Sequence, residues 1–163
     1  MANPFAGSKF YARLGNVFTR PLWSVFPAPQ GFGVLSTTGR KSGKPRRQSV
    51  RAIRDGDSVV VVAMMGERAN WLRNVRSDPR VTLRLGRVTL HGVAREVTEE
   101  SERQWAAKVY IGTIVPSDYT DYITYCWGLP SRRKIEEAHR TWFHEGIPVT
   151  IRIESRVMSA ASP

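Results

Sequence analysis

The sequence predicts one α+β domain, mainly β, in which short strands form a closed or split barrel with helices at its periphery. The chain has 163 residues, 41% of them hydrophobic, which suits a single folded domain over residues 1–163. Short strand patterns alternate with tight-turn signals such as Asp55-Gly56. The run from Val59 to Met64 is apolar at every position, which is typical of a strand covered on both faces. These observations favour a barrel over a doubly wound sheet.

The N-terminal region, residues 1–26, is predicted to contain an amphipathic helix. Ser8 can cap a helix that ends before Pro21. Its apolar residues recur at helical spacing on one face: Phe10, Leu14, Val17 and Phe18. Basic residues flank this face, and two interpretations follow. The helix lies on an anionic membrane surface, or it docks on its own domain.

The remaining elements follow in order along the chain. Strands are expected at residues 32–37, 48–54, 58–65, 81–85 and 88–97, with a short helix at 71–76. Thr98 and Ser117 are expected to cap the next two helices, and a third helix is expected at 131–143. A last strand is expected at 147–153, and the tail 155–163 is expected to be frayed.

A cationic loop, residues 37–47, connects the first two expected strands. It holds two glycines, five cations and three hydroxyls, and no carboxylate lies between Arg40 and Arg54. It is not a Walker A loop, because only three residues separate Gly39 from Gly43 and a proline follows Lys44. A dinucleotide-binding Gly-x-Gly-x-x-Gly motif is absent as well. Unpaired cations and close backbone donors favour an anion-binding loop, and a solvated turn is the alternative.

The net charge of +11 is concentrated in one part of the chain. Residues 40–95 hold 14 basic and 4 acidic residues, whereas residues 96–163 hold 8 basic and 10 acidic residues. This favours a polyanionic ligand, nucleic acid or an anionic membrane as partner. A single cysteine, Cys126, excludes an internal disulfide and suits a reducing compartment. Because no membrane span or signal-peptide core is found, we expect a cytoplasmic protein, with peripheral contact at the inner membrane face through the N-terminal helix.

Several motifs resemble, in the same order, those of the deazaflavin-dependent nitroreductase family, whose fold is a split β-barrel of the FMN-binding type. The stretch 37–46 is similar to the family's loop signature, and residues 70–74 (Asn-Trp-Leu-Arg-Asn) are similar to its Trp-x-x-Asn helix. The stretches 54–57, 78–81 and 92–97 resemble its hairpin turn and two later strands. The resemblance covers residues 34–100 well. It implies coenzyme F-420, an 8-hydroxy-5-deazaflavin with a phosphate and an oligoglutamate tail, and FMN is the less favoured alternative.

By this resemblance, the loop binds the tail and the neighbouring barrel wall binds the ring. The expected phosphate and tail ligands are Arg40, Lys41, Ser42, Gly43 and Arg46. The expected ring slot combines Val62, Ala63, Met64 and Met65 with Asn70, Trp71, Leu72, Arg73 and Asn74, and Gln48 and Ser49 are expected to reach the ring. Taken alone, Trp71 is equally consistent with plain core packing. No catalytic residue is assigned, because no nucleophile or acid–base motif is found and a cofactor would carry the reaction.

The chain departs from the family pattern in two places. Met64-Met65 stands where the family often has Ser-Lys, which leaves the proton donor unassigned and puts nitroimidazole reduction in particular in doubt. The segment 126–145 is an addition that could cover the mouth of the site or form an interface. Between these, residues 116–122 resemble the family's tyrosine-rich acceptor wall, so Tyr119 and Tyr122 are expected substrate contacts. The alternative is a helix that packs its aromatic residues at a surface.

The leading functional prediction is an F-420-dependent oxidoreductase that passes a hydride to a small electron-poor acceptor such as a quinone, enone or nitro compound. A basic nucleic-acid-binding module is the alternative, although no RNP, KH or helix-turn-helix signature supports it. A third candidate is a split-barrel protein that binds FMN, haem or a fatty acyl ligand. No metal site is expected, because the three histidines lack a ligand spacing. The oligomeric state stays open, and a homo-oligomer is compatible with the sequence.

Overall fold

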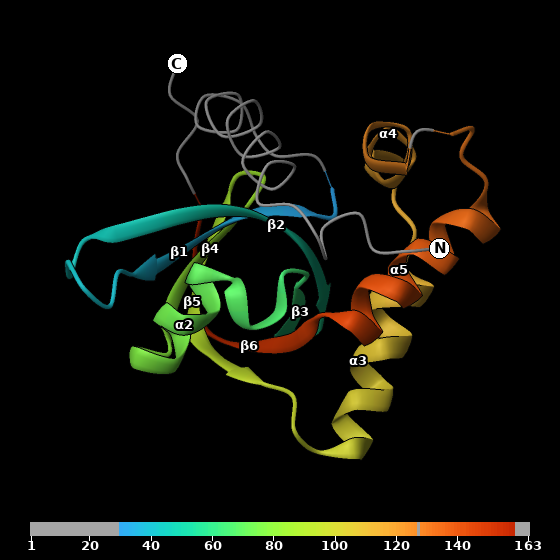
Figure 1. The fold of residues 1–163 in the computed structure, drawn as a ribbon. Helices are drawn as coiled ribbons and strands as arrows, with labels where there is room; N and C mark the ends of the chain where they lie inside the picture. The colour runs from blue at the N-terminus through green and yellow to red at the C-terminus, as the bar shows by residue number, and fades with distance from the viewer. Residues whose placement is uncertain (1–29, 127, 159–163) are drawn as a thin grey trace.

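The computed structural model describes residues 30–126 and 128–158. Six strands in this part of the chain form a closed antiparallel barrel in the order β1-β2-β3-β6-β5-β4 (Figure 1). The strands are β1 (Phe32–Thr38), β2 (Pro45–Asp55), β3 (Ser58–Ala63), β4 (Arg80–Leu85), β5 (Val88–Glu96) and β6 (Ile147–Met158). The predicted mainly β barrel with peripheral helices is thereby confirmed. Closure pairs every strand on both sides, so none is left as an exposed edge.

Strand β3 is buried on both faces, as its apolar run predicts. Val59 and Val61 point into the barrel interior, where they join the main hydrophobic cluster. Val60 and Val62 point outward into a second cluster with Tyr110 and Phe143. The alternation of a strand thus places one set of valines in each of two cores.

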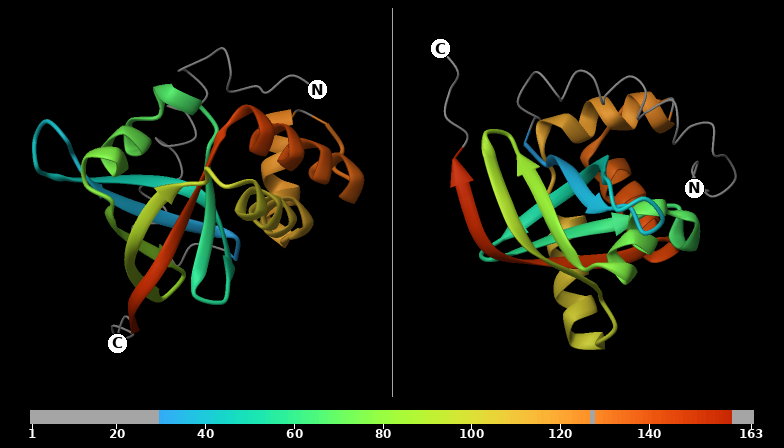
Figure 2. Two further views of the ribbon diagram at one scale, coloured as in Figure 1. Left: turned by 90° about the horizontal axis from the view of Figure 1, so that it is seen from below. Right: turned by 90° about the vertical axis from the view of Figure 1, so that its left-hand side faces the viewer.

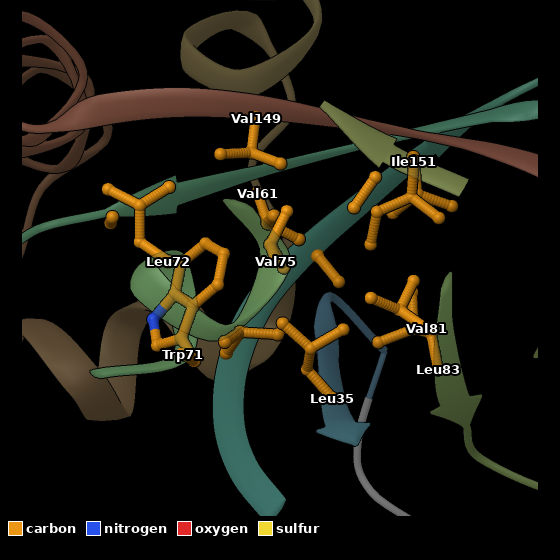
Figure 3. Packing of buried hydrophobic residues seen from close by; sticks show 14 of the residues in the cluster. Leu35, Val61, Trp71, Leu72, Val75, Val81, Leu83, Val149 and Ile151 are labelled. Carbon is orange, nitrogen blue, oxygen red and sulfur yellow. The ribbon is translucent and has the colours of Figure 1, made fainter. Parts of the chain in front are cut away.

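Four α-helices and one 3-10 turn surround the barrel in the described residues: η1 (Gly66–Arg68), α2 (Asn70–Ser77), α3 (Glu100–Gly112), α4 (Pro116–Cys126) and α5 (Arg132–Glu145). In α2, Trp71, Leu72 and Val75 pack into the barrel cluster, and Figure 3 shows them beside Val61 and Val149. Helices α3 and α5 cover the outer face of β3, and α4 packs on α5. None of the described helices is long and apolar enough to cross a membrane.

The loop between β1 and β2 and the helix group α3–α5 lie on opposite sides of the barrel. Figure 1 shows the loop projecting on one side and the three helices on the other, and the left view of Figure 2 shows the same arrangement. Strand β2 connects these two sides, because it begins at the loop and runs to the edge of the helix group.

The structure corrects several predicted element boundaries. Helix α3 has Glu99, not Thr98, at its N-cap, and no side chain caps it. Helix α4 begins at Pro116, so Ser117 is not its cap, and the Ser117 hydroxyl instead donates a hydrogen bond to the carbonyl of Gln30. Strand β6 continues to Met158 opposite β5, so residues 155–158 are strand rather than frayed tail. The N-terminal helix prediction, and the last part of the tail prediction at residues 159–163, lie outside the described residues.

Candidate functional site

The cationic loop is a tight connection that uses most of its own backbone donors. The N–H of Gly39 donates to the carbonyl of Lys44 at 2.9 Å, and the N–H groups of Ser42 and Gly43 both donate to the carbonyl of Gly39. A side chain at Gly39 would place its Cβ 2.8 Å from the Ser42 hydroxyl, and Gly43 has a positive φ of 64°. Both positions therefore favour glycine for the shape of the turn. Since these amides are already hydrogen-bonded, the cationic side chains are left as the main anion donors.

A buried asparagine ties the loop to α2. The Asn74 side-chain oxygen accepts from the backbone N–H of Arg40 at 3.3 Å and from its guanidinium at 3.2 Å. The Asn74 amide donates to the Thr37 hydroxyl at 3.0 Å, and both Asn74 and Thr37 are almost fully buried. Asn74, predicted as a cofactor contact, is therefore placed where it holds the loop in register with the helix.

The loop cations point into solvent without acidic partners. Arg40, Lys41, Lys44, Arg46 and Arg47 are all exposed. Among the described residues, none of these five forms a salt bridge with a carboxylate. Arg46 donates to the Ser42 hydroxyl at 3.4 Å, which brings the two together. A set of unpaired guanidinium and ammonium groups around a hydroxyl fits phosphate or several carboxylates, and this is the donor chemistry that the tail of coenzyme F-420 requires.

Two hollows lie beside the loop on the outer face of the barrel. The first, of about 220 Å³, is lined without any carboxylate by Val34, Ser36, Arg47, Gln48, Ser49, Thr82, Arg84 and Thr89. The second, of about 410 Å³, shares Ser36 and Thr82 with it and reaches Gly43 and Pro45. The Ser49 hydroxyl is buried and has no hydrogen-bond partner among the described residues.

The predicted ring slot is divided between core and surface. Val62, Ala63, Trp71 and Leu72 are buried in the hydrophobic clusters, whereas Asn70 and Arg73 are exposed. Met65 packs against the barrel cluster, and Met64 packs against the clusters of α3–α5, including Tyr122. The Met64-Met65 corner therefore lies between α2, which holds the loop, and α4, which carries the tyrosines. Among the described residues, this corner brings predicted cofactor residues next to the cluster that contains Tyr122.

The two predicted substrate tyrosines have different surroundings. Tyr119 is 40% exposed, whereas Tyr122 is 2% exposed and packs with Ile135, Ala138 and Trp142. A spacing of three residues places both on roughly the same side of α4, so the difference lies in what covers each of them: α5 packs over Tyr122, whereas Tyr119, one turn earlier, is left accessible. Of the two, Tyr119 is the one that a substrate can reach without displacing the α4–α5 packing.

Sequence reasoning missed a buried ion pair at the other end of β2. Arg51 points outward from the strand, and its guanidinium binds both carboxylate oxygens of Asp118, at 3.0 and 3.2 Å. The same group donates to the carbonyls of Tyr110 and Thr113 at 2.9 and 2.6 Å, and its Cζ lies 4.5 Å from the Tyr110 ring centroid. His139 lies 3.5 Å from Asp118. The only sequence signal was an arginine inside an otherwise apolar stretch of strand.

Burial and pairing shift the pKa values of these groups in opposite directions. Burial alone would raise the pKa of Asp118, but hydrogen bonds with His139 and Arg51 outweigh it and hold that pKa well below its usual range. Burial lowers the pKa of His139, and burial raises the pKa of Tyr110 to about 12. Burial, helped by the charge of Asp118, raises the pKa of Asp121 to about 7. Arg51 thus lies near two carboxyl groups. Asp118 is bound to it and stays ionised, whereas the pKa of Asp121 lies close to neutral pH.

The described residues contain no group of three or more His, Cys, Asp and Glu side chains arranged to bind a metal ion. His139, the most buried of the histidines, is engaged with Asp118. The chemistry that the described part offers is therefore anion binding at the loop and hydrogen bonding at the tyrosine helix.

Comparison with known proteins points in the same direction. The family described as F420H(2)-dependent quinone reductase matches residues 23–126, more than half of the chain. F420H(2)-dependent quinone reductases of Mycobacterium tuberculosis and Mycobacterium bovis are 36% identical to it over 56 residues. These matches cover 32% of this chain and 38% of each relative, so they span well under half of the relatives' length.

Solved structures share the fold over most of the chain. An F420-H2 dependent reductase, FDR-A, is 25% identical, has a TM-score of 0.52, and aligns over 80% of this chain and 99% of its own. A structure described as a domain-swapped dimer is 23% identical with a TM-score of 0.52, covering 87% and 97%. A heme binding protein from Mycobacterium smegmatis is 18% identical with a TM-score of 0.54, covering 81% and 50%. The last two show the barrel fold alone.

Proposed function

Because the chain belongs to the F420H(2)-dependent quinone reductase family, we propose that it is an oxidoreductase that reduces quinones with reduced coenzyme F-420. The observation that carries the proposal is the loop of exposed cations without acidic partners, which Asn74 holds against α2. The family membership agrees with the resemblance to deazaflavin-dependent enzymes that the sequence motifs predict. Enones and nitro compounds remain candidate acceptors of the same electronic type.

The proposed roles of the side chains follow from their positions. Arg40, Lys41 and Arg46 bind the phosphate and tail, each charge-assisted contact contributing about 1.5–3 kcal/mol. Met64 and Met65, which lie between α2 and α4, would line the side of the site that holds the ring and would keep it apolar. When bound, the reduced cofactor supplies a hydride, and the acceptor takes up one further proton to become a hydroquinone. Tyr119, at the exposed side of α4, can donate a hydrogen bond to the acceptor oxygen.

The proposal is tested by a cofactor panel. Purified protein is titrated with coenzyme F-420, FMN, NADPH and haem, and binding is followed by fluorescence and by the unfolding temperature. We expect saturable micromolar binding of coenzyme F-420 alone, followed by turnover when its reduced form is mixed with menadione. Stronger binding of FMN or haem, or no binding of the deazaflavin at micromolar concentration, contradicts the proposal.

The nucleic-acid alternative has its own signature. A basic surface that neutralises phosphates loses affinity steeply as salt rises, whatever the base sequence. Binding of a short DNA or RNA duplex at 50 and 200 mM salt, in competition with coenzyme F-420, separates the two readings. If the loop is the cofactor's tail site, the cofactor displaces the nucleic acid.

The oligomeric state and the membrane contact of the protein are each open to direct measurement. We propose that the enzyme forms a homo-oligomer, because a structure of the same fold is described as a domain-swapped dimer; light scattering or analytical ultracentrifugation measures this directly. The predicted contact of residues 1–26 with an anionic membrane is tested by co-sedimentation with vesicles that contain or lack anionic lipid. Binding that is equal for both vesicle types, or absent, contradicts the membrane prediction.

A further inference from the structure

The Arg51 guanidinium lies at the corner where α3 ends and α4 begins. Its two carbonyl acceptors, on Tyr110 and Thr113, belong to the last turn of α3 and its C-cap, where carbonyls lack helical partners. A cation at this end of a helix is also favoured by the helix dipole. Arg51 therefore fixes the end of α3 to strand β2.

Asp118 performs the matching task at the start of α4. It is the third residue of that helix, and its carboxylate accepts from the backbone N–H of Val115, at 2.8 Å. This is the reach-back bond by which an acidic side chain in the first turn caps a helix. The Arg51–Asp118 pair thus joins the end of one helix, the start of the next and the barrel wall in one buried contact.

Besides this pair, helix α4 is joined to the barrel side by the hydrogen bond from Ser117 to the carbonyl of Gln30 and by packing on Met64. In the described residues its apolar contacts are made mainly with α5, through Tyr122, and with Met64 and Ile114. Its other side is open, since Tyr119 is 40% and Ile123 is 55% exposed. Tyr119 directly follows Asp118, so a shift of the first turn moves the reachable tyrosine with it.

We propose that Arg51 and Asp118 are positioning residues that hold α4, and with it Tyr119, at the acceptor side of the site. The inference rests on the proposed function for its catalytic consequence. The proposal assigns the pair a role in positioning the acceptor and no role in binding the cofactor. Arg51 is five positions after Arg46 at the loop, roughly 17 Å along an antiparallel strand. Loss of the pair is therefore expected to leave the tail site intact.

The test uses Asp118→Asn, Arg51→Lys and the double variant Arg51→Met with Asp118→Leu, in the full chain. Asn keeps the shape of Asp118, and Lys keeps the charge of Arg51 but loses the planar fork. The double variant leaves no unpaired buried charge, so it keeps a folded protein available if the single variants fail to fold. Arg95→Ala is the matched control, because Arg95 and Glu102 form an exposed pair between β5 and α3, away from α4.

Two readouts are measured on every variant. For menadione reduction we expect kcat/KM to fall at least about tenfold, mostly through KM, while the Kd of coenzyme F-420 stays within about twofold. Arg51→Lys should retain more activity than the double variant. Hydrogen exchange, which needs no cofactor, should become at least about tenfold faster at residues 116–126 and unchanged at residues 70–77.

The outcomes separate the two proposals. Unchanged exchange at residues 116–126 in folded variants overturns the positioning role, whatever the activity. A Kd for coenzyme F-420 that weakens as much as kcat/KM overturns it too, since the pair would then only support the fold. A wild-type protein that neither binds the deazaflavin nor reduces menadione overturns the proposed function, while the exchange result still decides whether the pair holds α4.

Discussion

Strand β2 carries exposed arginines at its start and a buried arginine further along, and their roles differ. At its start, Arg46 and Arg47 are exposed and form no salt bridge among the described residues. Further along, Arg51 is 4% exposed, bonded to a carboxylate and to two carbonyls. In the sequence both belong to one basic stretch without acids. The difference is made by what covers the strand: the first residues of β2 are exposed, whereas α3 and α4 cover Arg51 in its buried stretch, residues 50–53.

This contrast shows that cations in one basic stretch of sequence can have either a binding role or a structural role. A cation that finds no internal acceptor stays solvated and available to a ligand, whereas one buried beneath helices must be neutralised inside the protein. The loop is therefore expected to tolerate substitution without unfolding, but not without loss of ligand. Substitution of Arg51 or Asp118 is expected to lower the stability of the fold but to leave ligand binding at the loop unchanged.

The largest expected effect is reversal of the loop charges. In the variant Arg40→Glu, Lys41→Glu and Arg46→Glu, affinity for coenzyme F-420 should fall at least about 100-fold, because each contact contributes about 1.5–3 kcal/mol. The unfolding free energy should fall by only about 1 kcal/mol, through the lost hydrogen bond between the Arg40 guanidinium and Asn74, since the three side chains are otherwise exposed. Isothermal titration and urea unfolding measure the two quantities.

The matched control reverses three exposed cations elsewhere: Arg87, Lys108 and Arg140. It makes the same change in net charge away from the loop, so cofactor affinity should fall only slightly, through long-range attraction. If both triple variants lose affinity equally, the loop is not a specific binding site for the cofactor. The proposed difference between the exposed and the buried arginines of β2 is then wrong.

The second-largest effect concerns the buried ion pair of Arg51 and Asp118. Arg51→Met leaves the buried Asp118 carboxylate without its cationic partner, with only His139 and the N–H of Val115 beside it, which should lower the unfolding free energy by about 3–5 kcal/mol. Adding Asp118→Leu should recover much of that loss, because the remaining unpaired charge is removed. Arg95→Met, which breaks an exposed pair, should cost at most about 1 kcal/mol. Equal losses for Arg51→Met and Arg95→Met in urea unfolding would show that the corner is no different from a surface pair.

These two regions also show how far sequence reasoning reaches. The strands were predictable because alternation and turn residues are local signals, and the loop was predictable because unpaired charge is visible in the residue order. The role of Arg51 was not, because its carboxylate partner is 67 positions away and follows two helices. Nor was the use of Asn74 as a tether, since its partners lie 34 and 37 positions before it. Long-range polar pairing leaves no periodic pattern in a sequence.

The third prediction sharpens the role of Asn74. Asn74→Ala removes the acceptor of Arg40 and the donor to Thr37, both in a buried setting, and should lower the unfolding free energy by about 1–3 kcal/mol. Because the loop loses its hold on α2, cofactor affinity should also fall, by about tenfold. Asn70→Ala, on the exposed side of the same helix, is the control and should change stability by less than about 0.5 kcal/mol. A variant that loses stability but not affinity would show that the loop binds the tail without being held in place.

The smallest effect separates the two regions by pH. Burial raises the pKa of Asp121 to about 7, whereas an unfolded aspartate titrates near pH 3.9, about three units lower. The folded state therefore holds this proton more tightly than the unfolded state. The stability that it provides is complete below about pH 4 and is lost as the pH rises through 7. No such loss is expected from substitutions in the loop.

Asp121→Asn should remove that slope. Between pH 5 and 8, the wild type should lose on the order of 1–2 kcal/mol relative to the variant, less than the full shift implies because Asp121 is only half-buried. His139 acts in the opposite sense, since its lowered pKa reduces stability as the pH falls below about 6.5, but it is present in both proteins and largely cancels in the difference. Urea unfolding at pH 5, 6, 7 and 8 measures this difference, with exposed Asp57→Asn as the control. If the unfolding free energies of wild type and Asp121→Asn change in parallel with pH, Asp121 is ionised in the folded state. Arg51 would then stabilise the carboxylates of Asp118 and Asp121 together.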